Sequence, residues 1–93
     1  MNNEVKVLKL TTGEEIITRM TEEDSGNLLL EKPMVIQQMA PDTTGRVGIG
    51  LVPWSFAGNT DSVTIESKYV LVTLESTSEM GKNYLSTITG ISL

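Results

Sequence analysis

Residues 5–32 read VKVLKLTTGEEIITRMTEEDSGNLLLEK and contain three short apolar segments separated by two turn sequences. The turn sequences are TTGE at residues 11–14 and DSGN at residues 24–27. Glycine tolerates left-handed backbone, and Asp, Asn, Ser and Thr side chains bond their own main chain at turns. The apolar segments carry leucine or β-branched side chains, which are typical of strands. This stretch therefore predicts consecutive strands of a small β-barrel.

The alternation of side chains indicates where these strands lie. In residues 5–10 apolar side chains point to both faces, so we expect both faces to be partly buried. Residues 15–22 alternate between a drier and a more polar face. Residues 27–39 form a third apolar region, but Pro33 within it cannot donate a ladder hydrogen bond. This strand is therefore expected to bend or break near Pro33.

The second half of the chain contains further strand patterns. Residues 40–45 are rich in turn formers, and residues 46–56 alternate again. Gly48 and Gly50 fall on one face of this segment, which indicates a sharply curved strand or a close backbone neighbour, as at a barrel corner. Residues 63–74 add short apolar segments around a turn at Glu66, Ser67 and Lys68, which brings the total to about five strands.

The C-terminal segment fits either a helix or an extended chain. Ser76 and Glu79 have the spacing of a capping box, and Gly90 suits a helix end. The branched side chains in residues 87–91 favour an extended chain instead. We prefer a short helix, because three side chains fall one helical turn apart: Met80, Tyr84 and Ile88.

Length and composition exclude several classes of protein. The chain has 93 residues, so we expect residues 1–93 to form a single domain with a modest core. Cysteine and histidine are absent, which argues against disulfides, thiolate nucleophiles, imidazole bases and most transition-metal sites. Residues 1–4 lack the pattern of a signal peptide, and no apolar run is long enough to cross a bilayer. We therefore expect a soluble cytoplasmic protein without a cofactor or a membrane partner.

The charge balance argues against general nucleic-acid binding. Seven basic and twelve acidic residues give a net charge of -5, which repels nucleic acid and anionic membranes at long range. The basic residues are scattered along the chain and form no run. They are therefore interpreted as solubilising charges.

Several of these residues resemble the first signature of Sm-like (Lsm) proteins. In that family a leucine, two residues and a glycine open the second strand, as Leu10 and Gly13 do here, and an aspartate follows the glycine by eleven residues, as Asp24 does. Asn27 follows Asp24 by three residues instead of the family's four. Residues 65–70, IESKYV, stand where the second signature would fall, and they match its isoleucine and valine ends only.

The resemblance implies an all-β fold, a small and strongly bent five-stranded barrel of the Sm-like (SH3-like) type. Its fourth and fifth strands would pair with neighbouring copies and close a homo-oligomeric ring of about five to seven subunits. Edge strands with apolar side chains must in any case be covered, closed or paired. The subunit interface is expected on two apolar strand regions and comprises Val47, Ile49, Leu51, Trp54, Val70 and Val72.

Sm-like rings hold single-stranded RNA through their third and fifth loops, where a side chain stacks a base and an asparagine reads it. The corresponding RNA-binding candidates here are Asp24, Asn27 and Lys68. Gly26 offers no stacking surface, and Glu66 places a negative charge where the family has arginine. Base stacking on an aromatic contributes about 1–3 kcal/mol per base, so its loss weakens this function. We therefore expect a non-catalytic scaffold with an unidentified protein partner, and RNA binding is the alternative.

The sequence gives little support for metal binding or catalysis. Acidic residues cluster at 14–15 and 22–24, but without the spacing of a calcium loop, and they are interpreted as solvated strand ends. Trp54 and Phe56 either form a partner-binding patch or complete the core. No serine or threonine has a base nearby in sequence, so no catalytic residue is expected. The Pro53-Trp54 segment and the acidic, strand-rich character also resemble small proteins of tailed phages of marine cyanobacteria, which would place the protein in a host cytoplasm.

Overall fold

The computed structural model describes residues 4–89. The residues at the N-terminal start and Gly90, the expected helix end, lie outside the described part. The structure is mostly β, with a short C-terminal helix, as the sequence predicted. Its elements are β1 (Glu4–Leu10), β2 (Glu15–Glu22), β3 (Asn27–Gln38), β4 (Ile49–Pro53), β5 (Ser62–Glu66), the 3₁₀ turn η1 (Ser67–Tyr69), β6 (Val70–Glu75) and α1 (Ser78–Thr89).

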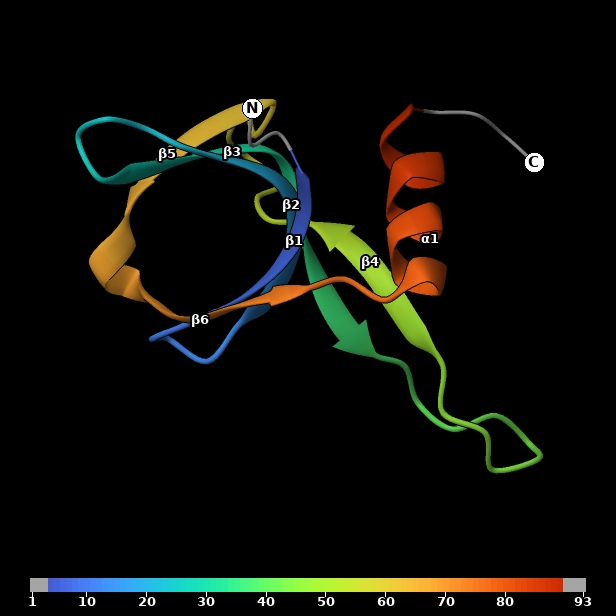
Figure 1. The fold of residues 1–93 in the computed structure, drawn as a ribbon. Helices are drawn as coiled ribbons and strands as arrows, with labels where there is room; N and C mark the ends of the chain where they lie inside the picture. The colour runs from blue at the N-terminus through green and yellow to red at the C-terminus, as the bar shows by residue number, and fades with distance from the viewer. Residues whose placement is uncertain (1–3, 90–93) are drawn as a thin grey trace.

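The strands form one antiparallel sheet that curls into an open barrel (Figure 1). The order along the sheet is β4, β3, β2, β1, β6, and β5 also pairs with β3. The long strand β3 pairs with two strands. Its first half pairs with β5, starting with Asn27 opposite Glu66. Its second half pairs with β4, ending with Gln38 opposite Ile49. The sheet therefore has six strands, of which β4 and β5 follow one another along the same side of β3.

The bend in β3 occurs where the sequence predicted it. Lys32 has a φ of 50°, in the left-handed region, and the following Pro33 is buried. The ladder between β2 and β3 shifts register between Ile17 and Arg19, opposite this bend. Beyond the bend β3 and β4 run together as an arm that extends from the barrel (Figure 1). Pro33 thus separates the barrel half of β3 from the arm half.

Two apolar clusters lie on opposite faces of the sheet, which is why neighbouring positions in one strand are both buried. The inner cluster fills the barrel and consists of Leu8, Leu10, Ile16, Met20, Leu28 and Leu30. The outer cluster lies under α1 and consists of Val7, Ile17, Met34 and Tyr84, with Met80 and Ile88 packed against it. The helix face that carries Met80, Tyr84 and Ile88 is therefore the face by which α1 docks onto the sheet, as expected.

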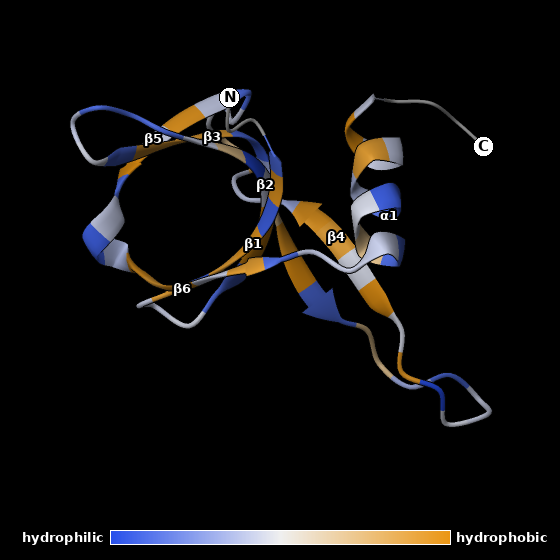
Figure 2. Ribbon diagram, in the orientation of Figure 1, coloured by the Kyte–Doolittle hydropathy of each residue, from blue (hydrophilic) through white to orange (hydrophobic). Residues whose placement is uncertain are grey.

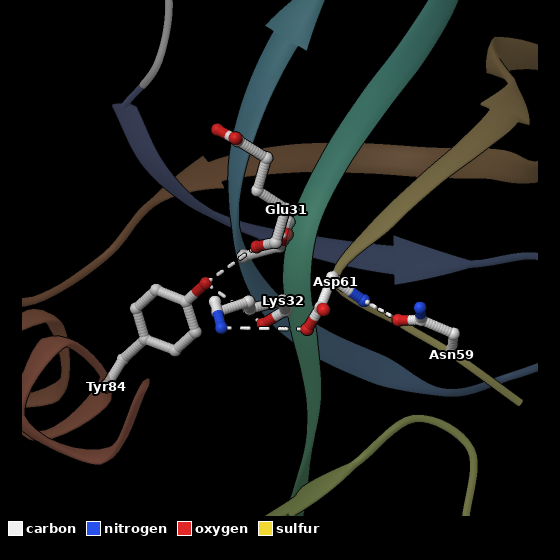
Figure 3. A network of polar contacts seen from close by, with 6 residues as sticks. Glu31, Lys32, Asn59, Asp61 and Tyr84 are labelled. Atoms are coloured by element: carbon white, nitrogen blue, oxygen red, sulfur yellow. Dashed lines mark hydrogen bonds and ion pairs between the residues drawn. The ribbon is translucent and has the colours of Figure 1, made fainter. Parts of the chain in front are cut away.

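The Tyr84 hydroxyl satisfies backbone groups at the bend of β3 (Figure 3). Tyr84 is fully buried, and its hydroxyl oxygen lies 2.8 Å from the Glu31 carbonyl and 3.0 Å from the Lys32 carbonyl, to which it can donate. It also accepts a hydrogen bond from the Arg19 N–H, at 3.2 Å. The hydroxyl of buried Thr18 donates to the Glu31 carbonyl as well, at 3.0 Å. Helix docking and the strand bend are therefore coupled through one polar network.

The two turns lie where the sequence predicts them, and the helix cap differs from the prediction by one residue. Gly13 has a φ of 100° and Gly26 a φ of 90°, the left-handed backbone that the two turn sequences predicted. The helix α1 is capped by Thr77, whose hydroxyl accepts a hydrogen bond from the Met80 N–H, so the expected cap at Ser76 is displaced by one residue. The Gly50 site lies against the side chain of Met39, whose sulfur is 2.8 Å from the place of a Cβ, so the close neighbour is a side chain and not the backbone that was expected.

Candidate functional site

The barrel is open between its last two strands. β5 and β6 are joined by η1, and in residues 4–89 no ladder links them. Within the described part of the chain, β6 pairs with β1 on one side only, and β4 and β5 pair only with β3. The outer edges of these strands therefore offer unpaired N–H and C=O groups, and such edges template pairing with another chain.

The edge strand β6 is apolar as well as unpaired. Leu71 is 70% exposed, Val72 42% and Leu74 46%, although all three belong to a strand. Figure 2 shows hydrophobic colour along β6 and along β4. Lys6 of β1 holds the end of β6 by an ion pair with Glu75 at 2.8 Å. The apolar strand is thus fixed on one side and free on the other.

The six residues expected at a subunit interface fall into two groups. Leu51 packs against the outer cluster, and Trp54 and Val70 pack against the inner cluster, so these three are partly buried within the chain. The other three have exposed side chains: Val47, Ile49 and Val72. Val47 and Ile49 lie on or next to the arm, and Val72 lies on β6.

Two of the RNA-binding candidates lie at neighbouring turns. Asn27 begins β3 and stands opposite Glu66, at the end of β5, in the ladder. Lys68 follows in η1, and its Nζ lies 3.2 Å from the Glu66 carboxylate. Asp24 is exposed in the turn between β2 and β3. Glu66 thus adjoins both Asn27 and Lys68, and its charge opposes an RNA phosphate at this position.

A slot that the sequence did not indicate opens at the end of the barrel. It has a volume of about 270 Å³ and is lined by Leu10, Thr11, Thr12, Glu14, Trp54, Ile65 and Tyr69. Trp54 reaches across from the segment after β4 and donates its indole N–H to the Glu14 carboxylate at 3.2 Å. Residues forty positions apart meet here, so no local motif could have revealed the slot. The second expected aromatic, Phe56, lies apart and is 86% exposed.

Some of the acidic side chains have partners within the chain, whereas those of residues 22–24 are exposed. Glu14 accepts hydrogen bonds from Trp54 and from the Thr12 hydroxyl, and Glu15 lies 3.9 Å from the Lys9 ammonium. Asp42, at the tip of the arm, accepts from the Thr44 hydroxyl, which is the main reason why the pKa of its carboxyl lies below the ordinary value. Across residues 4–89 no group of three or more acidic side chains is arranged to hold a metal ion.

Neither the helix nor any other described segment provides a helical membrane span. In the part of the chain that the structure describes, no helix is long and apolar enough to cross a bilayer.

The fold and its open edges define the class of protein: a small, strongly bent antiparallel barrel with a 3₁₀ turn before its last strand. The family model Sm_like domain matches residues 7–85, which is most of the chain. The protein therefore belongs to the Sm-like family. No curated protein sequence matches the chain significantly.

Proposed function

We propose that the protein is a non-catalytic scaffold that assembles head to tail into a closed ring and binds a protein partner. Sm-like proteins as a family are scaffolds and RNA binders that generally lack catalysis and typically form rings. The observation that carries the proposal for this chain is the pair of free strand edges. One edge is β6, and the other follows β5 and β4.

The two edges are different surfaces, so pairing between copies is heterologous. A heterologous contact repeated by rotation gives a closed ring, or a filament when the rotation does not close. Burial of exposed Val72 and Leu74 would also supply the apolar area that a single small barrel lacks. We assign the contact to the exposed candidates Val47, Ile49 and Val72. Leu51, Trp54 and Val70 are partly buried, and they would support this contact through their packing within the subunit.

Substitution of Val72 tests this contact. Because Val72 is exposed in the single chain, Val72→Lys should leave the barrel folded, yet it would bury an unpaired charge in the proposed contact. Light scattering coupled to gel filtration should then show smaller species than the native protein. Leu85→Lys is the matched control, since it places the same charge on a similarly exposed apolar residue of α1. Equal masses for all three proteins would remove β6 from the contact.

Single-stranded RNA binding is the second candidate, because Asn27 and Lys68 lie at neighbouring turns. The acidic surroundings of these turns oppose it, so we expect weak or undetectable binding of oligouridine at physiological salt. Binding at low salt should fall steeply as salt rises, because scattered lysines alone would provide it. Glu66→Arg and Ser67→Gly, together with an aromatic at Gly26, should raise the affinity, although the aromatic also costs stability because Gly26 has a φ of 90°. Tight, salt-resistant binding by the native chain would favour RNA binding over the scaffold.

A further inference from the structure

We propose that the slot at the barrel end binds a small organic cation with a methylated ammonium group. Two aromatic side chains, Trp54 and Tyr69, line the slot together with one carboxylate, Glu14. Leu10 and Ile65 add apolar side chains that also contact or belong to the inner cluster. Every lining residue comes from one chain, so the proposal does not rest on ring assembly.

The chemistry of the lining selects a cation. Aromatic faces attract cations through the ring quadrupole, and this attraction strengthens when water is excluded. Glu14 is the only charged residue among those that line the slot, and the net charge of -5 also favours cations at long range. A methylated ammonium group suits this lining because its methyl groups contact apolar surface while its charge faces the rings.

The position of Trp54 is fixed before any ligand binds. Its indole N–H is bonded to Glu14 at 3.2 Å, and its ring packs against the inner cluster. A carboxylate has about four lone-pair sites, so Glu14 keeps acceptor capacity and charge for a ligand beside it. The slot therefore needs little reorganisation, which lowers the cost of binding.

The Tyr69 ring already has a cation near it. Lys68 Nζ lies 5.3 Å from the ring centroid, and its other contact is the Glu66 carboxylate. Lys68 itself is not among the residues that line the slot. The volume of about 270 Å³ lies just below the roughly 300–1,000 Å³ of common ligand sites, so the slot fits a small head group.

The test uses choline and its neutral isostere 3,3-dimethyl-1-butanol as probes. Trp54 is the only tryptophan in the chain, so its fluorescence reports on the slot directly. We expect a saturable change with choline in the millimolar range and at least about threefold weaker binding of the neutral alcohol, because only choline gains the cation–π attraction. Sodium chloride at matched ionic strength is the control for screening and should produce no saturable change.

Three variants assign the interaction to the named side chains. Tyr69→Leu should weaken choline binding by at least about threefold, whereas Tyr69→Phe keeps the aromatic face and should bind nearly as the native chain does. Glu14→Gln keeps an acceptor for the indole but removes the charge, and it should also weaken binding. Tyr69 is half exposed, so its replacement leaves the barrel folded, which circular dichroism verifies.

Several outcomes would overturn the proposal. Equal affinity for choline and the neutral alcohol would mean an apolar slot without cation recognition. The absence of any saturable change would mean that the slot is closed to ligands of this size. A stronger response to uridine or guanosine monophosphate than to choline would identify a base-stacking site instead.

Discussion

Removal of one hydroxyl from Tyr84 is the sharpest perturbation of the fold. Tyr84→Phe keeps the ring in the outer cluster but deletes the hydroxyl that contacts the Glu31 and Lys32 carbonyls and the Arg19 N–H. Glu31 keeps the Thr18 hydroxyl as a donor. The Lys32 carbonyl and the Arg19 N–H lose their side-chain partner at the point where the ladder shifts register.

The expected cost follows from that count. A buried backbone group that loses its partner costs about 1–3 kcal/mol, and water can replace the hydroxyl at exposed Lys32, so Tyr84→Phe should lower the free energy of unfolding by about the cost of one such group. With a urea slope of about 1–1.5 kcal/mol/M for a domain of this size, the midpoint should fall by about 0.7–3 M. Chemical denaturation followed by circular dichroism measures this shift.

Tyr69 provides a matched control, because it is the only other tyrosine and its side chain is about half exposed. Tyr69→Phe should change the free energy of unfolding by less than about 0.5 kcal/mol. A double-mutant cycle with Thr18→Val should show coupling, since both hydroxyls donate to the same Glu31 carbonyl. Equal midpoints for Tyr84→Phe and the native chain would refute the claim that this hydroxyl stabilises the bend.

Three further predictions concern backbone strain, pH and helix capping. Gly13→Val should destabilise the protein by about 1–3 kcal/mol in urea, because Gly13 has a φ of 100°, whereas Gly48→Ala, without positive φ, should cost less. Burial raises the pKa of Tyr84, so its contribution to stability is complete below the unfolded value of about 10 and is lost as pH rises above it. The alkaline fall in melting temperature should therefore be shallower in Tyr84→Phe. Thr77→Ala should cost about 0.5–2 kcal/mol by removing the cap of α1, and an unchanged melting temperature would mean that the cap contributes nothing.

Features with a local cause could be predicted from the sequence. Gly13 required left-handed backbone in a tight turn, Pro33 predicted a bend in its strand, and Met80 and Tyr84 shared a helical face, and the structure contains all of these. The cap was expected one residue early, since Ser76 and Thr77 are chemically equivalent as caps and only the helix start distinguishes them.

Features that depend on tertiary contacts could not be predicted. The hydrogen bonds of Tyr84 require a register shift in a strand more than sixty residues away, and side-chain periodicity does not encode such shifts. The slot requires Trp54 to cross the barrel end to Glu14. The alternation in β6 likewise could not show that Val72 is exposed in the single chain.

The mass of the native particle in solution tests the central claim most directly. The subunit has a mass of 10.1 kDa. Native mass spectrometry or light scattering at micromolar concentration should give one discrete species that contains about five to seven subunits. This result is expected because heterologous pairing of two free edges closes into a ring. A stable 10.1 kDa monomer at that concentration would contradict the scaffold proposal.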